Sequence, residues 1–361
     1  LCKSRNRLIR EYPSTVQEIR FFTTIARGFR WHPWILWLGT WLYWIIGLGF
    51  TEPPRLLSRR KIEAEEPVVN ADDALGGFEY SDAYLHDNDA RFVFNFVRSA
   101  LSNGCIAANY VESLGAEYAH DVWRVMARDV ESGAGFTVRA KVLINAAGAW
   151  VDAHNQLTGI RTEHRHALSK GIHLIVDRIS QVERVLTFFA DDGRLFFAIP
   201  MGPCTCIGTT DTRVSDPQVE VTEEDRQFVL DNINKRLRLD KPLTSEDVIA
   251  TRCGVRPLAI KGEVGADTDF LQLSRKHVIE ADRSRAHLSV FGGKLTDCIN
   301  VGEEVCELVQ AIGLELPFPR YKWYGEPSRV VCEEFEHQAR LMNLDDMTAP
   351  ESSEPLSRRL W

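Results

Sequence analysis

The sequence lacks an excess of positive charge and lacks paired-cysteine motifs. Its 361 residues carry a formal net charge of −8, the isoelectric point is near 5.8, and the basic residues are scattered. Nucleic-acid binding requires a basic face that neutralises phosphates, so no nucleic-acid partner is expected. Eight cysteines occur without a CxxC pair and without histidines at zinc-finger spacing, so we expect free thiols and no metal site.

The N-terminal residues also lack the pattern of a secretory leader. Lys3, Arg5, Arg7 and Arg10 are followed by a polar, helix-like stretch instead of a short apolar core with a small-residue cleavage site. This pattern predicts a protein that stays on the cytoplasmic side of the membrane.

One long apolar segment stands out at residues 31–50, WHPWILWLGTWLYWIIGLGF. It contains five tryptophans and no formal charge, and basic residues flank it on both sides: Arg27, Arg30, Arg55, Arg59, Arg60 and Lys61. Pro33 and three glycines weaken a transmembrane helix, and the tryptophans do not gather at two ends. The pattern favours a peripheral or monotopic helix at a membrane surface; a buried helix pair and a true span remain alternatives.

Composition and periodicity predict a chain of two or three domains with mixed secondary structure. Of its residues 44% are hydrophobic and 26% charged. Polar residues and glycines at 68–78 predict a loop and a domain boundary. We expect helices at 89–103 and at 223–237, the second capped by Thr222. Strands are expected in a meander before residue 141, in a buried parallel strand at 141–145, and through 171–210 and 249–280.

A strand, a double-glycine turn and a helix follow in HLSVFGGKLTDCINVGEEVCELVQAIG. This order places backbone amides and a helix N-terminus at one point, which suits an anionic or electron-rich ligand group such as a phosphate or the pyrimidine edge of a flavin.

Seven sequence blocks, in order, carry a resemblance to a known family: GFEYSDAYLHDNDARFV, LINAAGAWVD, LSKGIHLIV, LFFAIPMGPCTCIGTTDT, GVRPL, LSRKHVIE and LSVFGGKLT. From about Arg5 onward the chain resembles flavin-dependent (aerobic, membrane-associated) glycerol-3-phosphate dehydrogenases. The resemblance implies an α/β and α+β chain with a glutathione-reductase-type FAD-binding domain, a substrate domain with a mixed or antiparallel sheet, and a helical C-terminal domain.

On this basis we divide the chain into five parts. They are a helical, Trp-rich membrane-associating segment at 1–75, part of the FAD domain at 76–160, the substrate domain at 161–285, a return strand and helix of the FAD domain at 286–313, and the start of the helical domain at 314–361. The family's GxGxxG turn, which holds the FAD pyrophosphate, is absent from the sequence. We therefore expect a fragment that lacks this unit and part of the helical domain.

The resemblance implies oxidation of glycerol 3-phosphate to dihydroxyacetone phosphate, with hydride passing to FAD and electrons passing on to quinone. Arg256 and Arg275 match substrate-site arginines, whose guanidinium groups suit a phosphate. His173 matches the active-site histidine and would act as the base, while Lys294 would place a positive charge at the flavin edge. The matching cofactor residues are Val111, Ala146, Ala147, Gly148, Thr210, Asp211, Gly292, Gly293, Leu295 and Thr296.

Three alternatives stay open beside the dehydrogenase. The chain could be a glycerol-3-phosphate oxidase that returns electrons to oxygen, a truncated and inert chain that cannot hold FAD, or an alcohol or amine oxidase on the same fold. The membrane surface is an expected partner, and the sequence leaves a homodimer open.

Overall fold

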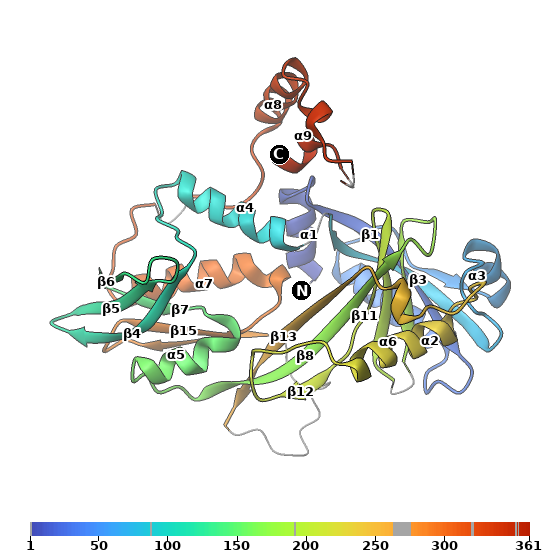
Figure 1. Cartoon of the computed structure of the whole chain (residues 1–361), viewed down its shortest axis with the longest axis horizontal. Helices are drawn as coiled ribbons and strands as arrows, with labels where there is room; N and C mark the ends of the chain where they lie inside the picture. The colour runs from blue at the N-terminus through green and yellow to red at the C-terminus, as the bar shows by residue number, and fades with distance from the viewer. Residues whose placement is uncertain are drawn as a thin grey trace.

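The structure is a computed structural model, and it describes residues 2–86, 89–190, 193–262, 276–318, 321–350, 352 and 354–361. A large sheet lies on one side of the molecule and two small sheets lie on the other, while the C-terminal helices stand apart from both (Figure 1). The fold class expected from the sequence is therefore present, with both mixed and antiparallel sheets.

The large sheet contains nine strands of the described chain. In spatial order they are β12 (Thr212–Val214), β8 (His164–Asp177), β11 (Cys204–Gly208), β10 (Leu195–Met201), β9 (Arg184–Phe189), β1 (Val16–Ala26), β3 (Ala74–Leu85) and β2 (Arg55–Leu57), and β13 (Ala250–Lys261) also pairs with β8. β1 and β9 are parallel, and the other pairs are antiparallel. The predicted strands of the middle third are confirmed.

One face of this sheet packs on the main hydrophobic core. Leu174 of β8 and Phe196 of β10 are buried there against Val229 and Ile233 of α6 (Glu223–Arg236). Thr222 caps α6 with a reciprocal pair of hydrogen bonds to Asp225, as the sequence predicts. Because α6 covers this face, the opposite face of the same strands is left to form a site.

The prediction of a helical segment at 1–75 is wrong in its middle. Only α1 (Cys2–Glu11), α2 (Pro33–Ile46) and α3 (Arg59–Glu65) are helical, and β1 runs through the large sheet between β3 and β9. The loop expected at 68–78 ends at Ala74, where β3 begins. A Cβ on Gly77 would lie 2.2 Å from the carbonyl oxygen of Thr23, so this glycine permits close strand contact and does not mark a turn.

The two small sheets form the second part of the fold. β4 (Val111–Ala119), β5 (Val122–Asp129) and β6 (Gly135–Ala140) make the predicted meander. β14 (His277–Asp282), β15 (His287–Gly292) and β7 (Leu143–Asn145) make the other sheet, in which β7 and β15 are parallel. The short helices η1 (Gly148–Trp150) and α5 (Val151–Leu157) follow β7, and η4 (Leu295–Asp297) and α7 (Cys298–Ala311) follow β15.

The strand predicted at 141–145 is parallel, as expected, but it is not fully buried. Asn145 is buried, whereas the Ile144 side chain is 42% exposed. Among the described strands β7 pairs only with β15, so it is an edge strand. The prediction of a buried strand rested on apolar composition alone, and composition does not tell an edge from a centre.

The helices on the remaining surfaces pack in small groups. α4 (Asp89–Ser102), predicted at 89–103, joins α1 in a cluster that contains Leu8, Tyr12 and Phe92. The C-terminal α8 (Arg329–Leu341), η5 (Leu344–Met347) and α9 (Leu356–Leu360) pack on one another. Another short helix, η2 (Ser245–Asp247), precedes β13.

The Trp-rich segment forms α2, which begins at Pro33 after the N-cap residue His32. Tyr43 and Trp44 turn inward: the Tyr43 hydroxyl donates to Asp82, and the Trp44 indole donates to the carbonyl of Thr51. Within the described chain, every helix falls short of the length and apolarity needed to cross a bilayer.

Candidate active site

A continuous row of paired residues crosses the open face of the large sheet. From β3 to β13 the row consists of Phe78, Thr23, Thr187, Phe197, Gly208, His173 and Arg252. Directly paired residues in a sheet point to the same face. The row therefore places His173 beside Arg252 on the face that α6 does not cover.

Arg256 reaches the same face from β13 and lies on Gly171 of β8. A Cβ on Gly171 would be 2.3 Å from one guanidinium nitrogen of Arg256, so only glycine leaves this space. Arg256 donates to the Thr209 hydroxyl at 2.8 Å and to the carbonyl of Thr210 at 3.3 Å. These contacts give the guanidinium a defined orientation in front of the sheet.

The ring of His173 likewise occupies space beside a glycine, its strand partner Gly208. A Cβ on Gly208 would lie 2.6 Å from Cδ2 of the His173 ring. Burial, together with the positive charges of Arg256 and Arg252, lowers the pKa of His173 to about 4. At neutral pH the ring is therefore uncharged and can accept a proton.

Two pockets open on this face of the sheet and share Phe21, Ala83 and Thr296. The first, of about 340 Å³, is lined by Arg252 and Leu295 among others, and the second, of about 570 Å³, is lined by Lys294. The turn that carries Lys294 therefore faces the same sheet surface as His173 and Arg256. His173 and Arg256 lie on this sheet face, Lys294 lines a pocket that opens on it, and the fourth predicted catalytic residue, Arg275, lies outside the described residues.

The two predicted cofactor turns lie side by side in the fold. Ala146, Ala147 and Gly148 follow β7. Gly292 is the last residue of β15, the parallel neighbour of β7, and Gly293 follows it. Ligands of α/β sheets bind at the carboxyl ends of parallel strands. The positions are small or side-chain-free, and Gly148, Gly292 and Gly293 all have positive φ values of 57°, 60° and 93°.

These turns fit the reactive end of a flavin. Ala146, Ala147, Gly148 and Gly293 are exposed, so a flat ring can approach their backbone closely. Lys294 adds a positive charge beside the turn, and Thr296 adds a hydroxyl on the pocket side. The residues of these two turns would hold the isoalloxazine ring of FAD, which supplies the hydride acceptor when bound.

The other predicted cofactor residues lie at two separate places. Val111 begins β4 and is 41% exposed. Thr210 and Asp211 lie next to Arg256, where the Thr210 hydroxyl accepts the Ile172 amide and Asp211 accepts the Ser169 hydroxyl. Thr210 and Asp211 thus bond to β8, and their assignment to the cofactor stays a prediction.

Arg252 is a site residue that lies outside the sequence blocks that carry the resemblance. It is four residues from Arg256 in one strand, and a period of two places both on one face. In the sequence TRCGVRPL this spacing is the signal that indicates Arg252 as a neighbour of Arg256 on the same strand face. Arg5 was also missed as a site residue: it lines the pocket of Lys294, is only 2% exposed, and stacks on the Tyr43 ring at 4.7 Å.

Solved structures define the class of fold. The chain is similar to the glycerol-3-phosphate dehydrogenase from Bacillus halodurans complexed with FAD, with a TM-score of 0.71 and 23% identity over 99% of this chain and 64% of that one. It is also similar to the glycine oxidase from Geobacillus kaustophilus, with a TM-score of 0.59 and 16% identity over 90% and 79% of the two chains. These likenesses show the fold that the sequence predicts.

The sequence assigns the family. Residues 36–286 match the family described as FAD dependent oxidoreductase, and the chain belongs to this family. It is 31% identical over 273 residues to the aerobic glycerol-3-phosphate dehydrogenase of Staphylococcus haemolyticus. The aligned residues make up 73% of this chain and 47% of the relative. The chain is also 31% identical over 271 residues to the protein of the same name from Staphylococcus aureus. The chain spans about half the length of these curated relatives.

Proposed function

We propose that this chain carries the substrate site of a flavin-dependent oxidation of glycerol 3-phosphate to dihydroxyacetone phosphate. The observation that supports this most directly is the convergence of Arg252, Arg256 and His173 on one sheet face, where Arg252 lines a pocket together with Leu295, the neighbour of Lys294. The relatives named aerobic glycerol-3-phosphate dehydrogenase support the same substrate.

The arginines would bind the phosphate group. Two guanidinium groups in front of β8 and β13 offer paired N–H donors that match the oxygens of a phosphate dianion. Arg256 is oriented by Thr209 and Gly171 before any ligand arrives, which reduces the entropy lost on binding. The phosphate would thereby fix the position of the C2 hydroxyl relative to His173.

His173 would accept the proton of the C2 hydroxyl. Burial and the two arginines hold its pKa near 4, and a bound phosphate dianion would offset the charge of the arginines and raise that pKa. The base would therefore become stronger when substrate is present. FAD, when bound, supplies the acceptor for the hydride from C2, and the ammonium of Lys294 would stabilise negative charge that develops nearby.

Phosphate dependence tests this function. We expect the full chain to be isolated with FAD, and glycerol 3-phosphate to bleach its visible flavin absorbance under anaerobic conditions while glycerol does not. Replacing Arg256 by Gln removes charged hydrogen bonds of about 1.5–3 kcal/mol each, so the KM should rise at least tenfold. Arg340→Gln, on exposed α8, is the matched control and should behave like the native chain. Equal reduction by glycerol, or an unchanged KM in Arg256→Gln, would overturn the proposal.

We further infer that the protein associates with the membrane surface, peripherally or monotopically on the cytoplasmic side, and passes electrons to quinone. The outer residues of α2 and its following turn support this: Leu42, Ile45 and Leu48 are 60%, 58% and 82% exposed. Thr40 and Tyr43 of the same helix line the pocket that contains Lys294. An acceptor that enters from the bilayer beside α2 would thus reach the flavin side of the site.

Vesicle binding tests the membrane inference. The native chain should sediment with vesicles that contain anionic lipid, and Leu42→Glu should reduce the bound fraction because it places a charge on the apolar face. Val330→Glu, at an exposed apolar position on α8, is the control and should leave binding unchanged. Equal loss in both variants, or no binding by the native chain, would contradict this inference. Stoichiometric peroxide in the absence of membranes would favour the oxidase instead.

A further inference from the structure

Another histidine of β8, His166, lies seven residues before His173 and contacts the turn that begins at Gly292. Its side chain is only 1% exposed, and its Nε2 accepts a hydrogen bond from the backbone amide of Gly292 at 3.0 Å. The ring packs against Phe291, with 5.2 Å between the ring centroids. A buried imidazole therefore binds the first residue of the turn that leads to Lys294.

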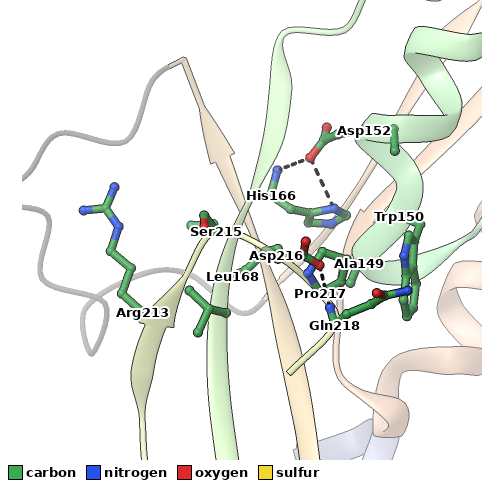
Figure 2. A pocket seen from close by; sticks show the side chains of 13 residues that line it. Ala149, Trp150, Asp152, His166, Leu168, Arg213, Ser215, Asp216, Pro217 and Gln218 are labelled. Atoms are coloured by element: carbon green, nitrogen blue, oxygen red, sulfur yellow. Dashed lines mark hydrogen bonds and ion pairs between the residues drawn. The ribbon is translucent and has the colours of Figure 1, made fainter. Parts of the chain in front are cut away.

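The hydrogen bond to Gly292 also determines the protonation of the ring. An amide can only donate, so Nε2 carries no proton and the neutral ring is protonated on Nδ1. Nδ1 faces Asp152 of α5, at 3.7 Å from Oδ2, and the same carboxylate oxygen accepts the backbone amide of His166 at 2.8 Å (Figure 2). Burial lowers the pKa of His166, and the Asp152 carboxylate opposes that shift.

The residues joined by His166 belong to the two segments that would flank the flavin. Asp152 lies four residues after Gly148, and Gly292 begins the second turn. Gly292 is closely confined: a Cβ there would lie 3.0 Å from the carbonyl oxygen of Lys276 and 3.1 Å from Cβ of Ala259. β13, which carries Arg256, therefore packs against this turn from another side.

We propose that His166 is a positioning residue that holds the Gly292–Gly293–Lys294 turn at a fixed distance from α5. It does not touch the reacting atoms, and it acts by keeping an acceptor at the Gly292 amide. Its effect on catalysis rests on the proposed function, whereas its effect on the turn does not.

Backbone amide exchange at Gly292 tests the contact in the full chain without added flavin. His166→Leu removes the acceptor and should raise the exchange rate of the Gly292 amide roughly fivefold. His166→Gln can place its side-chain carbonyl near the position of Nε2 and should restore slow exchange. His287→Leu controls for a general loss of stability, because His287 is also buried and lies in β15, the strand that contains Gly292. This variant should leave the exchange rate of the Gly292 amide unchanged.

Native exchange in His166→Leu, equal acceleration in His287→Leu, or no rescue by Gln would each overturn the proposal. In the flavin-loaded chain, His166→Leu should lower kcat with little change in KM, and Gln should recover kcat. If the native chain is not reduced by glycerol 3-phosphate, the proposed function fails, and the exchange measurement still decides the role of His166.

Discussion

Gly171→Ala displaces a substrate arginine without removing it, and so separates the position of Arg256 from its presence. The added Cβ would lie 2.3–2.5 Å from three guanidinium atoms of Arg256, so the guanidinium has to move. Those atoms are the end of a flexible side chain, and the backbone of Gly171 does not have a positive φ. The fold should tolerate the change, with an unfolding free energy within about 1 kcal/mol of the native value.

The displaced guanidinium would lose its bond to the Thr209 hydroxyl and its alignment with the phosphate. Charge-assisted hydrogen bonds contribute about 1.5–3 kcal/mol each, so we expect KM for glycerol 3-phosphate to rise about 10- to 100-fold. The assay is anaerobic flavin reduction over a range of substrate concentrations, with stability measured by urea unfolding.

Gly135→Ala is the matched control for this variant. Gly135 lies in β6 of the separate three-stranded meander, and a Cβ there would have only the carbonyl oxygen of Ala127 within 4 Å, at 3.9 Å. It should keep the native KM. A native KM in Gly171→Ala, or an equal rise in both variants, would refute the assignment of Arg256 to the phosphate.

Three other residues of the same sheet, Gly208, His173 and Glu79, carry testable predictions. Gly208→Ala puts a Cβ 2.7 Å from the carbonyl oxygen of Ile172, which is rigid backbone, so urea unfolding should show a loss of about 1–3 kcal/mol; native stability would contradict the close packing. The pKa of His173 should rise from about 4 in Arg256→Gln, as followed by NMR of the ring protons, and no rise would mean that Arg256 does not face the ring. Because the folded pKa of His173 lies below the unfolded one, its contribution to stability is present above about pH 6.5 and is lost as the pH falls toward 4. Glu79→Gln should lower the free energy of unfolding by about 3–5 kcal/mol, measured by thermal or urea unfolding. The variant removes the buried carboxylate to which Arg20, Arg55 and Arg184 donate. A smaller loss of stability would show that water or Glu65 replaces this carboxylate.

Much of the secondary structure could be predicted from local pattern. The apolar spacing in 89–103 and the Thr222 cap were sufficient for α4 and α6, because both signals lie within the element itself. β1 was missed because its polar side chains, including Glu18 and Arg20, resemble those of a surface helix. Arg20 instead extends along the sheet to Glu79, a partner 59 residues away in the sequence.

The candidate site divides in the same way. His173 and Arg256 were found because each lies in a short motif, whereas Arg252 needed the strand period. His166 could not be found from pattern, because its partners Asp152 and Gly292 are 14 and 126 residues away in sequence. Apart from the helical character of its first segment, which β1 contradicts, the division of the chain into domains stays a prediction.

The most direct test of the proposed site is an experimental structure of the flavin-loaded chain with glycerol 3-phosphate bound. We predict the phosphate between Arg252 and Arg256, the C2 hydroxyl within hydrogen-bond distance of His173, and the flavin ring beside the Gly292–Gly293 turn. A phosphate bound on another surface, or a substrate whose C2 faces away from His173, would contradict the assignment.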